Sequence, residues 1–338
     1  MRRIGFVLLL CAPAWAAVTG TVVNRTTGQP QAAATVGLYT MGQDGLDLVE
    51  QTKSDAQGKF TINQEVQPGP HMIRAMLDAV TYNLMLPPGS PATNLTVEVY
   101  NSSKQPGAAK VGKHMILFAP GSGQMVVDET YLCSNGGKTT WNDPGHGTMR
   151  FYLPPAAGGK VAVNGTGPGG LPLGVPVDKT SAPDVYAVDF PVKPGETRFD
   201  LTYTVPYTEG APYAGKIVTK DDDTYLISAN GVTLQGENLN DLGNEPRTQA
   251  HVYGFTGGAA YRIVLTGTAQ AAPPAPAENA DAADSDSGPR IEAIMPRIYG
   301  QAKLILALAL GILALGLALL YRAAPPTTTK ETHERGRR

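Results

Sequence analysis

Cysteine and charge are both scarce in this chain of 338 residues. Only two cysteines occur, Cys11 and Cys133, and 17% of the residues are charged, with a formal net charge of −2 at pH 7. So few cysteines exclude a cysteine-rich metal site and a fold held by several disulfides. The balanced charge argues against a nucleic-acid partner, because proteins that bind nucleic acid concentrate basic residues.

The residue patterns of common catalytic and metal sites are also missing. A zinc peptidase typically places its first ligands in a His-x-x-Glu pattern, and none of the five histidines begins one (His71, His114, His146, His251 and His333). No G-x-S-x-G nucleophile elbow or P-loop is present. We therefore expect no catalytic, cofactor-binding or metal-binding residues and no cofactor. Serine chemistry with partners distant in the sequence stays open as an alternative.

The first of two long apolar runs lies at the N-terminus. Residues 1–16 contain two arginines, a short apolar stretch and Ala14-Trp15-Ala16, the arrangement of a signal peptide cleaved before Ala17. An uncleaved N-terminal anchor is the alternative, but residues 4–11 are too few to span a bilayer. Cleavage would leave Cys133 as the one cysteine of the exported chain, which could then form no internal disulfide.

The second apolar run predicts a transmembrane helix over residues 302–321. Residues 304–320 carry no charge, and a helix of this length covers roughly 30 Å, the thickness of a hydrocarbon core. Small residues line one face of the helix and would allow weak self-association, although such residues are also ordinary fillers of Leu-rich spans. They are Ala307, Gly311, Ala314 and Ala318.

Basic residues fix the expected orientation of this span. The tail over residues 322–338 is rich in Lys and Arg, which places it in the cytoplasm and agrees with export of the chain behind the signal peptide. We expect a single-pass cell-membrane protein whose N-terminal domains are extracytoplasmic, either periplasmic or on the cell surface. We also expect residues 268–290 to form a disordered Pro/Ala/acidic linker, and residues 291–301 to form a juxtamembrane segment that lies at the bilayer interface or is irregular.

The exported part predicts an all-β fold with two domains. The whole chain contains 39 Gly and 28 Pro, which favours a fold with many turns. No long helical periodicity occurs before residue 300. Within residues 17–103, Asp55 and Gly58 predict a hairpin turn that directs Phe60 and Ile62 inward. Two alternating sets predict strands with one apolar face: Ala34, Val36 and Leu38, and Leu95, Val97 and Val99.

The patterns of residues 17–103 also resemble a known module. They read Gly20-x-Val22, Thr27-Gly28-x-Pro30, Ala34-x-Val36-x-Leu38, Ser54-Asp55-x-x-Gly58-x-Phe60-x-Ile62 and Gly69-x-His71-x-Ile73. This series is similar to the carboxypeptidase regulatory-like domain, a transthyretin-like β-sandwich. The resemblance implies a fold and no activity, since the module is an accessory to many different proteins. Related Cna-type modules carry a Lys–Asn isopeptide bond that starts from the first strand, and we expect none because no lysine precedes Lys53.

Residues 104–267 predict a second sandwich of Ig-like or jelly-roll-like type. Turn signals recur every eight to fifteen residues and separate eight or nine short strands. The clearest strand points four side chains to one face, Phe199, Leu201, Tyr203 and Val205. Pro194-Gly195 predicts the turn that precedes it. Further strands are expected at HMILFA, QMVVDETYLC, TMRFYLP, VYAVDFP, KIVT, TYLISA and AYRIVLTG.

Three further features have an ordinary structural interpretation. Cys133 is expected to be a small buried core residue, against the alternative of a reactive or intermolecular thiol. The cluster Asp221-Asp222-Asp223 predicts a solvated turn, with a Ca²⁺ site as the alternative. Four Asn-x-Ser/Thr sequences are expected to serve turns and strands, and not to carry glycans. They begin at Asn24, Asn94, Asn101 and Asn164.

Together these features favour a membrane-anchored extracytoplasmic binding or scaffold protein of the bacterial envelope that is not an enzyme. Its expected partners are the lipid bilayer and an envelope protein or polysaccharide of unknown identity. One alternative is an accessory subunit of a membrane complex, which would use the helix and the tail to bind its partner. Another is a hydrolase that acts on cell-wall or peptide substrates.

Overall fold

The structure, a computed structural model, describes residues 17–42, 45–219 and 221–270. The predicted signal peptide, juxtamembrane segment, transmembrane helix and cytoplasmic tail lie outside the described residues, as do His333 and most of the linker. No helix within the described ranges is long and apolar enough to cross a membrane.

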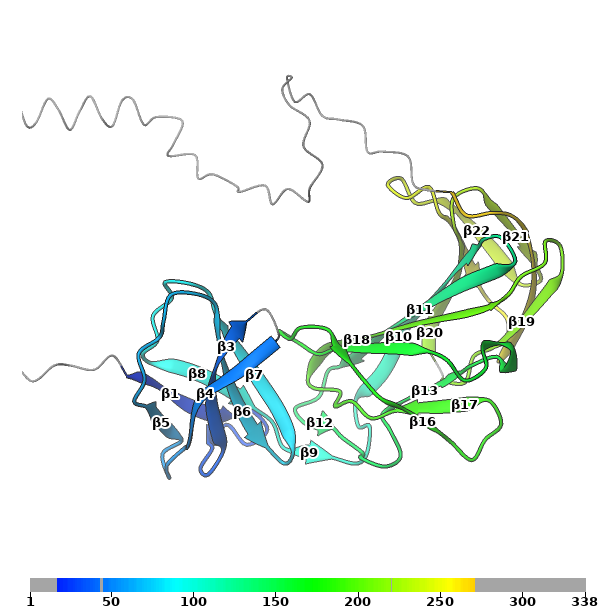
Figure 1. The fold of residues 1–338 in the computed structure, drawn as a ribbon. Coiled ribbons are helices and arrows are strands. Elements are labelled where there is room, and N and C mark those ends of the chain that lie inside the picture. Colours follow the sequence, from blue (N-terminus) through cyan, green and yellow to red (C-terminus); the bar gives the residue numbers. More distant parts are fainter. Residues whose placement is uncertain (1–16, 43–44, 220, 271–338) are drawn as a thin grey trace, which may run out of the picture. The chain divides into compact units, whose positions relative to one another are not determined.

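The predicted all-β architecture is confirmed for the residues that the structure describes (Figure 1). The described residues form strands in several sheets and a single short 3₁₀ turn, η1 (Pro155–Ala157). They enclose two hydrophobic cores, one between Val18 and Val99 and the other between Val111 and Leu265. We call the parts around these cores the N-terminal module (residues 17–103) and the second module (residues 104–270).

Two sheets enclose the core of the N-terminal module. In the first, β1 (Val18–Asn24) pairs with antiparallel β2 (Gln29–Pro30) and β5 (Lys59–Ile62) and with parallel β8 (Leu95–Val99). The second sheet has the order β4-β3-β6-β7. Its strands are β3 (Thr35–Gly42), β4 (Gly45–Lys53), β6 (His71–Leu77) and β7 (Val80–Leu86). Most of the alternating residues predicted to point inward, among them Val36, Leu38 and Val97, are at most 1% exposed, while Leu95 is partly buried.

The Asp55–Gly58 turn forms as predicted. Oδ1 of Asp55 accepts hydrogen bonds from the backbone N–H groups of Gln57 (2.9 Å) and Lys59 (2.8 Å). Gly58 has φ +72°, and a Cβ there would lie 2.6 Å from the carbonyl oxygen of Val22. Only glycine meets both requirements. The turn starts β5 in the register that buries Phe60 and Ile62 in the core of the N-terminal module.

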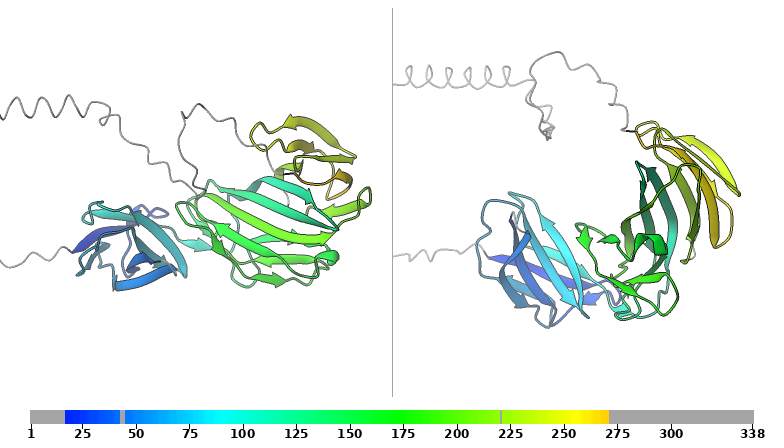
Figure 2. Two further views of the ribbon diagram at one scale, coloured as in Figure 1. Left: turned by 45° about the horizontal axis from the view of Figure 1, so that its top comes forward. Right: turned by 45° about the vertical axis from the view of Figure 1, so that its right-hand side comes forward.

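An eight-stranded sheet dominates the second module (Figure 1). Its order is β15-β14-β18-β11-β10-β20-β23-β22, and the pair β10·β20 is parallel. Figure 2 shows its long strands side by side. The strands are β10 (Ala109–Pro120), β11 (Gln124–Asn135), β14 (Ala162–Thr166), β15 (Leu173–Gly174), β18 (Gly195–Pro206), β20 (Asp221–Ser228), β22 (Leu239–Asn244) and β23 (His251–Phe255).

Two three-stranded sheets and one short pair complete the described fold. One sheet has the order β13-β17-β16, and the other has the order β19-β24-β21. A parallel pair joins β9 (Ser102–Ser103), at the end of the N-terminal module, to β12 (Thr140–Trp141). The strands of the two sheets are β13 (Met149–Tyr152), β16 (Val177–Lys179), β17 (Val185–Val188), β19 (Pro212–Lys216), β21 (Val232–Gly236) and β24 (Ala260–Gly267).

Strand β18 buries the side chains that its sequence predicts. Phe199, Leu201, Tyr203 and Val205 are each at most 3% exposed, while Thr202 and Thr204 face solvent. The neighbouring strand β11 alternates in the same way and directs Glu129 into the core. A charged side chain therefore lies on a face that is otherwise apolar and aromatic.

Several local predictions for the second module are wrong. KIVT is not a strand, because β19 ends at Lys216. Pro194-Gly195 does not form the centre of a turn, since Gly195 already begins β18 and pairs with Asn135. More than nine strands are present, β10 to β24, because β14, β21, β22 and β23 contain too few alternating apolar residues to be recognised.

Two segments expected to be irregular are also more ordered than predicted. The aspartates at 221–223 begin β20 and not a turn, because the parallel pairing with β10 extends to Asp221 and Asp223. The linker was expected to start at residue 268, yet Ala269 and Gln270 still donate backbone hydrogen bonds to Pro120 (2.7 Å) and Asn230 (2.9 Å).

Candidate functional site

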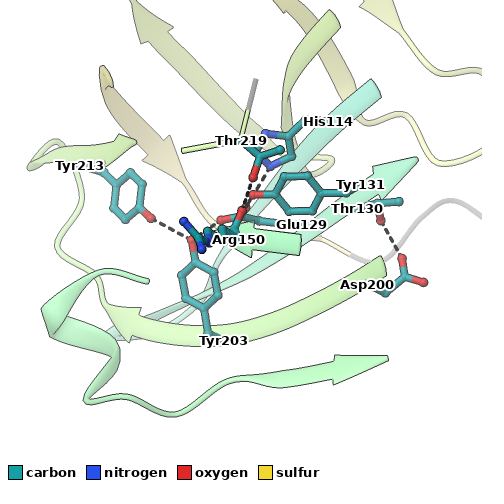
Figure 3. Close-up of polar contacts among 9 residues, drawn as sticks. All are labelled: His114, Glu129, Thr130, Tyr131, Arg150, Asp200, Tyr203, Tyr213 and Thr219. Atoms are coloured by element: carbon teal, nitrogen blue, oxygen red, sulfur yellow. Dashed lines mark hydrogen bonds and ion pairs between the residues drawn. The ribbon is translucent and has the colours of Figure 1, made fainter. Parts of the chain in front are cut away.

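The core of the second module holds a buried carboxylate with three hydrogen-bond donors (Figure 3). Glu129 on β11 is 5% exposed. Its Oε2 accepts a hydrogen bond from the Tyr131 hydroxyl (2.8 Å) and lies 2.9 Å from Nε2 of His114. Its Oε1 accepts a hydrogen bond from the Tyr203 hydroxyl (2.7 Å). A buried carboxylate is tolerated when its oxygens are satisfied in this way.

Strand register explains why His114 and Tyr131 reach the same carboxylate. The two residues are direct partners across β10 and β11, so their side chains leave the same face of the sheet. Their rings stack with centroids 3.8 Å apart and an interplanar angle of 16°. Glu129 lies two residues before Tyr131 and points to that face as well.

A row of tyrosines extends from the carboxylate toward the sheet β19-β24-β21. The hydroxyls of Tyr203 and Tyr213 lie 3.2 Å apart, and the rings of Tyr213 and Tyr261 have centroids 6.3 Å apart. Burial raises the pKa of Tyr203 and of Tyr261 well above the usual value, and the negative charge of Glu129 raises both further. Burial is also the main cause of the raised pKa of Tyr213. The three phenols therefore stay protonated at neutral pH and act as hydrogen-bond donors.

The opposite face of the same sheet is polar and solvated. There Thr130 donates to Oδ1 of Asp200 (2.7 Å; Figure 3), and Thr202 donates to Oδ1 of Asp128 (2.6 Å). Arg198 adds an ion pair to Asp200 (2.7 Å). In each Thr–Asp pair the two residues lie directly opposite each other on β11 and β18, and their side chains hydrogen-bond at the solvent-exposed face. The two faces of β11 thus carry one buried and one exposed polar network.

The last tyrosine of the row, Tyr261, also lines a groove of about 640 Å³ at the surface. Tyr152 and Phe255 are the more accessible rings of the groove, and the Phe255 ring meets that of Tyr261 edge-on with centroids 5.8 Å apart. The groove lies within the size range of small-molecule sites, roughly 300 to 1,000 Å³. It connects to the buried carboxylate only through side chains, since Tyr213 and Tyr203 stand between them.

Two glycines in the lining of the groove allow neighbouring groups to approach the backbone closely. The Tyr261 ring lies across the backbone of Gly215, where a Cβ would be 2.2 Å from Cζ and 2.3 Å from the hydroxyl oxygen. A Cβ on Gly236 would be 3.0 Å from the carbonyl oxygen of Arg262. Both positions have ordinary strand conformations, so the requirement for glycine comes from close approach and not from backbone φ.

Four exposed polar side chains in the groove are not engaged by other described side chains through hydrogen bonds or ion pairs. They are Lys216, Gln235, Glu237 and Arg262. The Lys216 ammonium lies 5.1 Å from the centre of the Tyr152 ring, a cation–π contact. The groove therefore combines aromatic rings with hydrogen-bonding groups that are free to meet a ligand.

The described histidines lie in separate places. His71 is buried, with Nδ1 3.1 Å from the carbonyl oxygen of Gly69, and His114 belongs to the Glu129 cluster. His146 lies beside Asp143 (3.3 Å), and His251 lies beside Asp241 on β22 (2.6 Å). Within the described residues, no group of three or more His, Cys, Asp or Glu side chains could hold a metal ion.

The structure also shows the surroundings of Cys133 and of the aspartate cluster. Cys133 is 5% exposed, as predicted, and burial raises the pKa of its thiol to about 12. Asp222 forms an ion pair with Lys110, in which both side chains are more than half exposed, and Asp223 faces solvent. An exposed pair of this kind contributes little to stability.

Sequence reasoning missed both the buried cluster and the groove. The alternation of Met125, Val127, Glu129, Tyr131 and Cys133 does carry a signal for the cluster, because it places a lone acidic residue on the buried face. No comparable signal exists for the groove. Its residues come from β13, β19, β21, β23, β24 and the loop after β21, and only the folded chain brings them together.

Comparisons with known proteins add little to this geometry. No protein-family model matches the sequence, and no curated protein matches it. Among solved structures, the M1 zinc metallopeptidase of Deinococcus radiodurans is similar at 12% identity, with 47% of this chain covered and a TM-score of 0.27. A mutant of that enzyme, alone and bound to a Tyr-Ser-Ala substrate, gives the same TM-score at 11% identity. The match spans 42% of the length of those chains, and a likeness this weak carries no conclusion about fold or activity.

Proposed function

We propose that this chain is a membrane-anchored extracytoplasmic binding or scaffold protein of the bacterial envelope and that it is not an enzyme. The observation that carries the proposal is the groove of the second module. It offers accessible rings beside polar side chains that other described side chains do not engage, which is the composition of a recognition site.

The burial and hydrogen bonding of Glu129 and of the nearby phenols support a binding role and not a catalytic one. A general base must reach a substrate proton, and a nucleophile must be activated. The Glu129 carboxylate is instead buried and receives three donors, and the nearby phenols have a raised pKa. This arrangement suits a role in holding β10, β11, β18 and β19 together beneath the groove.

The proposed architecture has two tandem sandwiches on a membrane tether. The N-terminal module would be a transthyretin-like sandwich of the carboxypeptidase regulatory-like type, and its two sheets around one core are compatible with that fold. The second module would be an Ig-like or jelly-roll-like sandwich. The apolar runs at residues 1–16 and 302–321 support a signal peptide and a single transmembrane helix, with the tail in the cytoplasm.

Photo-crosslinking in native membranes tests the binding role. A photoreactive residue at exposed Asn238, in the groove, would be activated in cells that carry the full chain. We expect a distinct crosslinked partner that is lost in the double variant Gln235→Ala, Arg262→Ala. Replacing Thr202 and Thr204 by Ala, on the solvated face of β18, should leave the crosslink unchanged.

The same experiment separates this role from that of an accessory subunit. Exchange of residues 302–321 for an unrelated transmembrane span should preserve the crosslink if the groove recognises the partner. Loss of the crosslink on that exchange, with no effect of the groove variant, would contradict the proposal and favour the accessory role.

A further inference from the structure

We propose that the groove of the second module binds a saccharide that carries a carboxylate group. This inference rests on the proposed binding function and names the ligand class for the same site. The groove offers three chemical features that fit such a ligand: aromatic rings, cations and neutral or acidic hydrogen-bonding side chains.

The aromatic rings supply surfaces for the apolar faces of sugar rings. An aromatic ring carries negative charge density on its face, which attracts the weakly positive C–H groups of a sugar. Tyr152 and Phe255 are both partly exposed at the groove. The Phe255 ring is held in place, since it packs edge-on against Tyr261 and closely over Gly257. A rigid ring of this kind loses little conformational entropy when it binds a ligand.

The cations select for an acidic group. Lys216 and Arg262 line the groove against the single carboxylate of Glu237. Lys216 and Arg262 come from neighbouring strands, because Lys216 pairs with Ala260 and Ala214 pairs with Arg262 across β19 and β24. A guanidinium can hold a carboxylate through two parallel hydrogen bonds, and an ammonium adds a point charge. The excess of one positive charge therefore favours an acidic sugar over a neutral one.

The remaining polar groups suit hydroxyls. Gln235, Glu237 and Asn238 follow one another closely at the end of β21 and line the groove. Their amides both donate and accept hydrogen bonds, and the carboxylate of Glu237 accepts them. Sugar hydroxyls also donate and accept, so these three residues can bind neighbouring hydroxyls of one ring.

The central strand of the groove has no free backbone edge for an extended peptide. Peptide strands commonly bind by adding to a sheet edge with free N–H and C=O groups. The central strand of the groove, β24, is paired on both sides: Gly215 faces Tyr261 on one side, and Gly236 faces Ile263 on the other. A ligand that lies over β24 is therefore recognised through side chains, which is the mode that sugars require.

Calorimetric titration of the detergent-solubilised full chain tests the inference. The probe is tetragalacturonate, and maltotetraose is the neutral comparison. We expect the acidic tetrasaccharide to bind at least tenfold more tightly than the neutral one, with an affinity that falls as salt rises. The double variant Lys216→Gln, Arg262→Gln should weaken binding of tetragalacturonate at least tenfold, and Tyr152→Ala should weaken it as well.

A second double variant controls for the change in net charge. Lys179→Gln, Arg198→Gln removes the same charge from exposed positions that do not line the groove, and it should leave binding unchanged. Equal binding of both tetrasaccharides, binding of neither, or equal loss in the control variant would overturn the inference. If the crosslink at Asn238 still depends on Gln235 and Arg262 while no saccharide binds, the binding function stands and the saccharide assignment fails.

Discussion

The hydroxyl of Tyr203 donates a hydrogen bond of 2.7 Å to Oε1 of Glu129 and so ties β18 to β11 within the core of the second module. Two further groups contact this carboxylate, the hydroxyl of Tyr131 and the ring of His114. The same Tyr203 hydroxyl contacts that of Tyr213 on β19 (3.2 Å). Four strands of two sheets, β10, β11, β18 and β19, therefore meet at one hydrogen-bonded centre.

Removal of the carboxylate should strongly destabilise the second module. In Glu129→Ala, the hydroxyls of Tyr131 and Tyr203 would lose their acceptor inside the core, and a cavity would remain. We expect the free energy of unfolding to fall by about 3 to 5 kcal/mol, the usual result of breaking a buried charged network. Denaturant titration followed by tyrosine fluorescence measures the change.

Asp128→Ala provides the matched control for this substitution. Asp128 precedes Glu129 on β11, but it lies on the solvated face and accepts a hydrogen bond from Thr202. Its removal should cost less than about 1 kcal/mol, as is typical of exposed polar pairs. Equal effects of the two substitutions would contradict the structural role given to Glu129.

High pH should weaken the fold through Tyr203. Burial and the charge of Glu129 raise the pKa of Tyr203 above the usual value of 10 in the folded state. Above pH 10 the unfolded chain therefore loses the phenol proton while the folded chain retains it, so stability falls as pH rises. In Tyr203→Phe, the decline in unfolding free energy above pH 10 should be smaller than in the parent chain. A decline of equal slope in both chains would show that Tyr203 does not contribute.

Lys193 should make the stability of the fold rise with pH, at lower pH values than those at which Tyr203 makes it fall. Burial, with a smaller effect of Arg74, lowers the pKa of Lys193 from 10.5 to about 8. Between pH 8 and 10.5 the unfolded chain binds more protons at this residue, so stability rises with pH across that window, by a few kcal/mol at most. Lys193→Met should abolish this rise. Unfolding curves of both chains at pH 7.5, 9 and 10 test the prediction, and parallel changes in the two chains would refute it.

The sequence predicted most strands that have a strict apolar alternation. In β18, β8 and β3, alternate residues are large and apolar, and the faces assigned to them are the faces that the structure buries. Strands β21 to β23 were missed because residues such as Gln235, Asn240 and Gly254 break the alternation. Their positions depend on pairing with distant strands, and a local pattern does not encode such pairing.

The difference between local alternation and long-range pairing also explains which part of the candidate site could be predicted from the sequence. Glu129 could have been recognised, since its position between Val127 and Tyr131 places it on the buried side of β11. The groove could not, because Tyr152 and Arg262 stand more than a hundred residues apart in the chain and meet only at one surface. Long-range register therefore determines the groove, while local alternation determines the core.

A side chain at Gly215 should disrupt the groove. A Cβ at this position would lie 2.2 Å from Cζ of Tyr261, so in Gly215→Ala the buried ring or the strand must move. We expect a loss of about 1 to 3 kcal/mol in unfolding free energy, as for other overpacked core positions, together with loss of the crosslink at Asn238. Gly258→Ala is the control, because no atom lies within 4 Å of its added Cβ and its φ is not positive. Unchanged stability and crosslinking in Gly215→Ala would show that Tyr261 does not shape the groove.

Cys133 should be unreactive until the second module opens. The side chain is 5% exposed, and burial raises the pKa of its thiol to about 12. The thiolate is the reactive species, so its small population and its burial both slow the reaction with a thiol reagent at pH 7.5. We expect a native labelling rate at least a hundredfold below that of the same protein in guanidinium chloride. The Glu129→Ala variant should label faster than the parent chain, because labelling through opening follows the stability of the module. A native rate close to that of the unfolded chain would instead show that a reagent reaches the thiol in the folded state, and it would favour the alternative of a reactive cysteine.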